Sequence, residues 1–175
     1  RLLSASVRAF TLSAGFVVLA GASLLTALLR DDFSIAYVAS VSSVDLETPM
    51  KVAAFYSSQA GSLLYWATVM SVLLAALVVM VGPRMAWAAG QLVGISGLVV
   101  TAFLVPLAFM ASPFRLSDSL LVDGQGLNPL LVDRGMLVHP PMLLGGLAST
   151  AAPFVLGAAA LAAGRVDGAW IRLVR

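Results

Sequence analysis

The sequence predicts an all-α integral membrane protein with about four transmembrane helices, two long outer loops and both ends in the cytoplasm. Hydrophobic residues make up 61% of the 175 residues and charged residues only 10%, whereas soluble domains have about 45–50% and about 25%. The mean hydropathy is +1.02. A transmembrane helix needs about 20 mostly apolar residues, and the apolar residues gather in stretches of that length. These observations exclude an ordinary soluble domain, a disordered segment and a coiled coil.

The first helix is expected at about residues 9–29, an uncharged stretch that follows Arg8. The alternative is a secretory signal peptide with a basic N-terminus and a small-residue cleavage site at residues 20–22. Signal peptides have apolar cores of about 7–15 residues, and the apolar run here continues to Leu29. A retained helix is therefore the preferred interpretation.

The second and third helices are expected at about residues 62–81 and 85–110, joined by the short connection Gly82-Pro83-Arg84. A connection of about three residues permits only an antiparallel helical hairpin. Pro106 should kink or fray the last turn of the third helix.

The fourth helix is expected at about residues 140–163. Pro140 and Pro141 suit its first turn, where a missing N–H group costs nothing, and Gly164 suits its end. Pro153 lies within this helix.

The expected helix interiors carry little that suggests chemistry. Gly90 and Gly94 have the spacing that lets two helix backbones approach closely. Gln91 is the strongest polar side chain at depth, and a packing hydrogen bond explains it better than a substrate contact. No charged residue lies inside the expected spans, which argues against a pump or a permease subunit.

The basic residues predict the orientation of the chain. Cytoplasmic loops of membrane proteins carry an excess of lysine and arginine. The ends and the 82–84 turn would share one side, with Asp167 as its acidic residue and six arginines: Arg1, Arg8, Arg84, Arg165, Arg172 and Arg175. The opposite side holds Arg30, Lys51, Arg115 and Arg134 with the other seven acidic residues. Both ends are therefore expected in the cytoplasm, and loops 30–61 and 111–139 outside.

Residues 1–175 are interpreted as a single transmembrane domain. The absence of cysteine excludes disulfides, thiolate metal sites and a cysteine nucleophile. The net charge of +2 comes from scattered basic residues that form no patch, so no nucleic-acid partner is expected. The chain begins at Arg1 rather than methionine, which leaves its native ends open.

The first outer loop reads as a structural segment. Apolar residues occupy every second position from Phe33 to Tyr37, which favours an extended conformation. A short interfacial helix from Met50 to Tyr56 is expected to follow, with its aromatic side chains at the lipid headgroups.

The second outer loop contains His139, the only histidine of the chain. It precedes two prolines and stands at the start of the fourth helix, at the outer membrane interface. Its neutral ring nitrogen can ligate haem iron or another metal, but on composition and position alone a capping or hydrogen-bonded interface histidine is the favoured interpretation. Asp133 lies six residues before it, yet no serine is singled out as a third member of a catalytic triad, and no catalytic residue is assigned.

Several outer segments together resemble the CcmF family, the haem lyase subunit of cytochrome c maturation, and its nitrite-reductase-associated relatives. Order and spacing agree from about Asp31 to the end. The matching segments are residues 32–40, Gly61-Ser62-Leu63-Leu64-Tyr65-Trp66, Ser112-Pro113-Phe114, Leu127-Asn128-Pro129-Leu130-Leu131, Gly135-Met136, His139-Pro140-Pro141 and Gly164-Arg165-Val166-Asp167.

The resemblance implies a multi-pass protein of the cell (inner or plasma) membrane that receives haem b from a periplasmic haem chaperone. The haem is then attached to cysteines of apocytochrome c as thioethers, with other maturation subunits present. His139 matches a histidine that serves this family as an axial ligand of the haem iron. The second axial ligand would lie outside this chain, which resembles the N-terminal part of a longer protein or one subunit of a split one. Alone, such a fragment is expected to be inactive as a lyase.

The chain also departs from the family pattern. Gln59 and Ala60 replace the usual His-Glu before the Gly-Ser-Leu-Leu segment, and Leu144 and Leu147 replace tyrosines. Gly126 and Arg134 likewise replace the family's aspartate and proline. These changes favour the alternative function, a non-catalytic membrane scaffold or assembly subunit that binds no haem.

Overall fold

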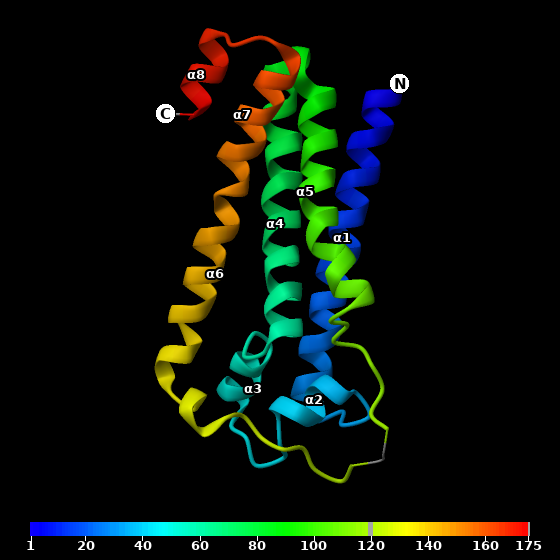
Figure 1. Ribbon diagram of the computed structural model, residues 1–175, viewed down its shortest axis with the longest axis vertical. Coiled ribbons are helices and arrows are strands. Elements are labelled where there is room, and N and C mark those ends of the chain that lie inside the picture. Colours follow the sequence, from blue (N-terminus) through cyan, green and yellow to red (C-terminus); the bar gives the residue numbers. More distant parts are fainter. Residues whose placement is uncertain (119–120, 175) are drawn as a thin grey trace.

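The computed structural model describes residues 1–118 and 121–174, which form helices joined by loops (Figure 1). The helices are α1 (Leu2–Leu29), α2 (Ala36–Val41), α3 (Thr48–Ala54), α4 (Gln59–Val81), α5 (Ala89–Phe109), α6 (His139–Ser149), α7 (Ala151–Ala163) and α8 (Gly168–Val174). Short 3₁₀ segments are η1 (Gly82–Ala88), η2 (Pro129–Leu131) and η3 (Arg134–Leu137). The long helices run along one another, with α2, α3 and the long loops at one end and the N-terminus and α8 at the other (Figure 1).

The expected all-α membrane protein is confirmed. Among the described residues, three helical stretches are long and apolar enough to cross a membrane: Leu2–Leu29, Gln59–Phe109 and Arg134–Ala163. The first begins earlier than the expected residue 9 and so includes Arg8.

The second stretch is bent back on itself at η1, so that α4 and α5 lie side by side (Figure 1). The backbone of Met85 is not helical there, with φ −119° and ψ 46°. The expected three-residue connection is wrong, because the turn occupies Gly82–Ala88 and α5 begins only at Ala89. The Met85 side chain is fully buried, and the longer turn carries it into the core.

The expected single helix at 140–163 is interrupted at Thr150, between α6 and α7. Pro153 has no N–H group for the Ser149 carbonyl, and its ring crowds that carbonyl. The Thr150 hydroxyl donates a hydrogen bond to the Leu147 carbonyl at 2.7 Å. Pro106 has a milder effect, since α5 passes through it and ends at Phe109.

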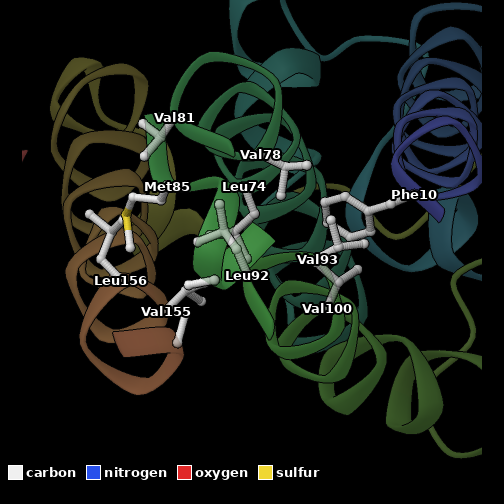
Figure 2. Close-up of a cluster of buried hydrophobic side chains, with 12 residues drawn as sticks. Phe10, Leu74, Val78, Val81, Met85, Leu92, Val93, Val100, Val155 and Leu156 are labelled. Carbon is white, nitrogen blue, oxygen red and sulfur yellow. The ribbon is translucent and has the colours of Figure 1, made fainter. Parts of the chain in front are cut away.

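Two clusters of buried side chains hold the helices together. The first joins α1, α4, η1, α5 and α7. Figure 2 shows Phe10 reaching from α1 toward Val93 of α5, and Met85 lying beside Leu156 of α7. The second cluster lies at the loop end and packs α2 and α3 against α1 and α4.

The spacing of Gly90 and Gly94 does not serve helix packing within the described part of the chain. A Cβ atom built at either glycine would meet no other part of the described structure within 4 Å. A closer approach occurs at Gly21 of α1, where a Cβ would lie 3.2 Å from Thr68 Oγ1 of α4. The GxxxG face of α5 is thus open, and the close packing expected of it is not observed among the described residues.

Candidate functional site

The two long loops are joined to each other along their backbones. The Ala36 amide donates to the Arg115 carbonyl at 2.9 Å, and the Ser117 amide donates to the Ser34 carbonyl at 2.8 Å. Ile35 forms an isolated antiparallel bridge with Leu116 between these bonds. The loops therefore form one unit at this end of the bundle.

The extended conformation expected from Phe33 to Tyr37 is wrong beyond Ile35, because α2 begins at Ala36. Phe33 and Tyr37 are both buried. They are four residues apart, a spacing that places side chains on the same side of a strand and also on the same side of a helix. The alternation therefore could not separate the two conformations.

The second loop is also fastened to the end of α2. The Gln125 amide donates to the Ala39 carbonyl at 2.7 Å, and the Gly126 amide donates to the Ser42 carbonyl at 3.0 Å. Gly126 has a φ of 80°, which glycine adopts without strain. The Asp123 carboxylate accepts a further bond from the Val44 amide at 2.9 Å.

A short helix is present near the expected residues 50–56, but α3 spans Thr48–Ala54 and ends before Phe55 and Tyr56. Tyr37 caps its end. The Tyr37 hydroxyl lies 2.9 Å from the Ala54 carbonyl oxygen and 3.1 Å from that of Phe55. Burial raises the pKa of Tyr37 to about 12. A Cβ atom at Gly61 would overlap the Tyr37 hydroxyl and the Phe55 carbonyl, so the first turn of α4 can pack here only with glycine at position 61.

His139 is the first residue of α6, and Pro140 and Pro141 occupy the first turn as expected. Its side chain is exposed. Among the described residues, no hydrogen bond or ion pair engages its imidazole. The ring nitrogens therefore remain available to a ligand, and the alternative role as a hydrogen-bonded interface histidine finds no contact in the described part of the chain.

Two tyrosines fix the backbone on either side of His139. The Tyr56 hydroxyl donates to the Met136 carbonyl at 2.8 Å, and the Tyr65 hydroxyl donates to the Pro141 carbonyl at 3.1 Å. The two rings pack edge to face with centroids 5.8 Å apart. Burial, and then the neighbouring Tyr65, raise the pKa of Tyr56. We call Tyr56 and Tyr65 the tyrosine clamp.

Two exposed apolar residues flank His139 in the sequence. Val138, directly before it, is 59% exposed, and Met142, one helical turn after it, is 70% exposed. An imidazole with apolar neighbours is one of the arrangements that hold haem iron in proteins. No group of three or more histidine, cysteine or acidic residues that could hold a metal ion occurs among the residues described. The described part of this site presents a single imidazole, that of His139, which could hold a haem iron or another metal.

Polar residues in the motifs before His139 cap short turns. The Asn128 side chain accepts a bond from the Leu130 amide at 3.0 Å, and the Asp133 carboxylate accepts one from the Gly135 amide at 2.6 Å. These contacts shape η2 and η3. Asp133 therefore has a structural role.

Four of the six departures from the CcmF pattern fall on α-helices. Gln59 and Ala60 form the first turn of α4, and Leu144 lies in α6. Leu147 lines an apolar cavity of about 320 Å³ together with Trp66. The positions where tyrosines are usual thus carry apolar side chains in the helix that begins at His139.

Sequence reasoning did not identify the roles of Tyr37, Tyr56 and Tyr65, nor the pairing of Lys51 with Asp31. The Lys51 Nζ atom lies 2.6 Å from Asp31 Oδ2 and links α3 to the end of α1. Aromatic residues near membrane interfaces are common, so composition alone gave these tyrosines no special weight.

Comparison with known proteins shows that this chain is similar to several cytochrome c-type biogenesis proteins. The chain is 38% identical over 161 residues to the cytochrome c-type biogenesis protein CcmF of Pseudomonas aeruginosa, covering 91% of this chain and 24% of that protein. It is 34% identical to CcmF of Escherichia coli, over 91% of this chain and 25% of that protein. It is 34% identical to the cytochrome c-type biogenesis protein NrfE of Haemophilus influenzae, over 75% of this chain and 21% of that protein.

The chain spans about a quarter of the length of the CcmF relatives it matches. No family model matches it. No solved structure shows a significant match either.

Proposed function

Because this chain belongs to the CcmF family of cytochrome c-type biogenesis proteins, to whose N-terminal part it corresponds, we propose that it holds haem b through His139 during cytochrome c maturation. One observation carries the proposal. The imidazole of His139 is exposed and without a partner among the described residues, while its backbone is fixed on both sides by the tyrosine clamp.

Each part of the site has a role in this proposal. The His139 imidazole would hold the iron through a ring nitrogen, and the apolar side chains of Val138 and Met142 would cover part of the porphyrin. The clamp limits the motion of the backbone that carries the imidazole, which reduces the ordering cost of ligation. When bound, haem b would supply vinyl groups to which cysteine thiols of apocytochrome c could add, with sulfur bonding to one vinyl carbon and the thiol hydrogen going to the other. A second ligand of the iron would come from outside these 175 residues.

The proposed partners follow from this role. They are a periplasmic haem chaperone that delivers haem, the apocytochrome c that receives it, and other maturation subunits. In this arrangement the protein is a multi-pass component of the cytoplasmic membrane whose haem site faces outward.

The proposed topology has four crossings, by α1, α4, α5 and the α6–α7 pair, with both ends in the cytoplasm. Its support is the reversal at η1 (Figure 1) and the excess of arginine at the end that holds the N-terminus and η1. Loops 30–61 and 111–139 then lie outside.

Haem titration of the purified chain in detergent tests the haem role. Wild type should give a saturable Soret band, which His139→Ala should lose or strongly weaken. Val44→Ala is the control, because Val44 is exposed in the other loop and should leave the band unchanged. An identical band in His139→Ala would refute the assignment.

Cysteine labelling tests the topology, and the absence of native cysteine makes every single-cysteine variant unambiguous. Val44→Cys should react with a membrane-impermeant maleimide added to intact spheroplasts. Ala86→Cys, an exposed position in η1, should react only after lysis. The reverse pattern would invert the proposed orientation.

The second candidate is a scaffold or assembly subunit that binds no haem. It is favoured by the apolar residues Leu144 and Leu147 and by Gln59 and Ala60, where the family pattern has tyrosines and His-Glu. If no saturable Soret band forms with wild type, this function replaces the haem role.

A further inference from the structure

A groove of about 400 Å³ lies at the basic end of the bundle, between α1, α4, η1 and α5. Its walls are largely apolar and include Val7, Val79, Ala86 and Val93. Arg8 is the charged residue among the described residues that line it. The groove is remote from the candidate haem site, which lies at the loop end (Figure 1).

The Arg8 guanidinium is exposed and forms no ion pair or hydrogen bond with the described residues. Two of the other arginines at this end are engaged. Arg84 donates to the Met80 carbonyl, and Arg165 lies over the Trp87 ring at 5.4 Å and 3.8 Å from an Asp167 carboxylate oxygen. Arg8 therefore has a positive charge available to a ligand at the groove.

The position of Arg8 along α1 matches the level of lipid headgroups. With a rise of 1.5 Å per residue, Arg8 and Arg30 are separated by about 33 Å along the helix. The hydrocarbon layer of a bilayer is about 30 Å thick. The two arginines can thus stand at opposite boundaries of that layer, with Arg8 beside the phosphates of one leaflet.

We propose that this groove binds an acidic phospholipid. Its phosphate pairs with the Arg8 guanidinium, and the first part of an acyl chain lies against Val79 and Val93. Basic pockets between transmembrane helices are suited to anionic headgroups, and guanidinium pairs well with phosphate. The net positive charge of this end of the molecule favours an acidic lipid over a zwitterionic one.

The size of the groove argues against a transmembrane helix as the occupant. Its α1 wall comprises Leu3, Ser4, Val7 and Arg8, a length of about 8 Å. A helix that crosses the membrane would need contact over several turns. The upper part of one lipid molecule fits this short wall.

Lipid binding can be measured as a rise in Tm of the detergent-purified chain when phosphatidylglycerol is added. Phosphatidylcholine and inorganic phosphate serve as separate additions. We expect phosphatidylglycerol to raise the Tm and the other two to have little effect. Stabilisation by inorganic phosphate alone, or equal stabilisation by phosphatidylcholine, would overturn the proposal.

Two variants distinguish the contribution of the Arg8 charge to lipid binding from the contribution of the groove. Arg8→Ala should weaken phosphatidylglycerol binding about fivefold, the effect of one basic residue near an anionic surface, and Arg8→Lys should restore much of it. Ala86→Leu keeps the charge and fills the groove, and it should also weaken binding. The matched controls are Arg30→Ala and Ala22→Leu, exposed positions toward the other end of α1.

The pattern of affinity losses among these variants decides whether the groove binds the lipid. Loss of affinity in both Arg8→Ala and Ala86→Leu, with both controls unchanged, supports the site. Loss in Arg8→Ala alone would show headgroup attraction without a groove, and equal losses in Arg30→Ala would show a nonspecific charge effect. Either result would overturn the proposal. Should Arg8→Ala fail to fold, the comparison of Ala86→Leu with Ala22→Leu still decides it.

Discussion

The Nζ atom of Lys51 lies 2.6 Å from Oδ2 of Asp31, and the ion pair connects α3 with the end of α1. The Lys51 side chain is only 9% exposed and that of Asp31 is 23% exposed. Asp31 also has a φ of 54°. Its amide donates to the Leu28 carbonyl and the Asp32 amide to the Ala27 carbonyl, the pattern that ends many helices with a left-handed residue.

Lys51→Met should destabilise the fold because it leaves the Asp31 carboxylate without its partner. The expected loss is about 1–3 kcal/mol in the free energy of unfolding. Asp31→Asn/Lys51→Met should recover part of the loss, since asparagine tolerates the left-handed conformation and carries no charge. Thermal or denaturant unfolding in detergent measures both, and a double variant less stable than Lys51→Met would contradict the ion-pair explanation.

Removing the hydroxyls of the tyrosine clamp should weaken haem binding without removing the iron ligand. Tyr56→Phe and Tyr65→Phe each lose one bond, worth about 0.5–1.5 kcal/mol, so the Kd for haem should rise about two- to tenfold. Tyr37→Phe is the control, because its hydroxyl bonds to α3 and not to the His139 segment. It should lower stability and leave the haem Kd unchanged. Equal Kd changes in all three variants would show a general folding effect.

Stability should fall at alkaline pH because of Tyr37. Burial raises its pKa from 10.0 to about 12, which means that the folded state favours the neutral hydroxyl. The stabilisation is fully present below pH 10 and is lost as the pH rises through about 12. The Tm of Tyr37→Phe should therefore depend less on pH in this range than that of wild type. Parallel Tm curves for the two proteins would disprove this role of Tyr37.

Gly61→Ala should be strongly destabilising, although alanine favours helices. The added methyl group would overlap the Phe55 carbonyl and the Tyr37 hydroxyl, and overpacking costs about 1–3 kcal/mol. Gly94→Ala is the matched control, since a Cβ there meets no other part of the described structure and the change should raise the free energy of unfolding slightly. Equal effects of the two variants on Tm would contradict the close approach at Gly61.

The long helices could be predicted from sequence because their signal is local. About twenty apolar residues in a row permit few structures in a membrane, and the helix at about 9–29 appears as α1. The charged residues Arg30, Asp31 and Asp32 also marked the end of that helix in the sequence. The geometry of the turn between α4 and α5 could not be predicted from the sequence. The length of η1 depends on the burial of Met85 against α7, which is a contact between distant parts of the chain.

The candidate site shows the same limit. His139 stood out because it is the only histidine and precedes two prolines. The clamp did not, since Tyr56 and Tyr65 contact carbonyl groups about eighty residues away. No local pattern encodes such a contact. The alternation at Phe33 and Tyr37 was likewise ambiguous until the burial of both residues was known.

The two bonds of the tyrosine clamp end on main-chain oxygens rather than on side chains. Every amino acid offers that acceptor, so replacements at positions 136 and 141 retain it. The residues around His139 can therefore change, and their side chains can adapt to a different partner. The backbone that carries the imidazole keeps its position relative to α4.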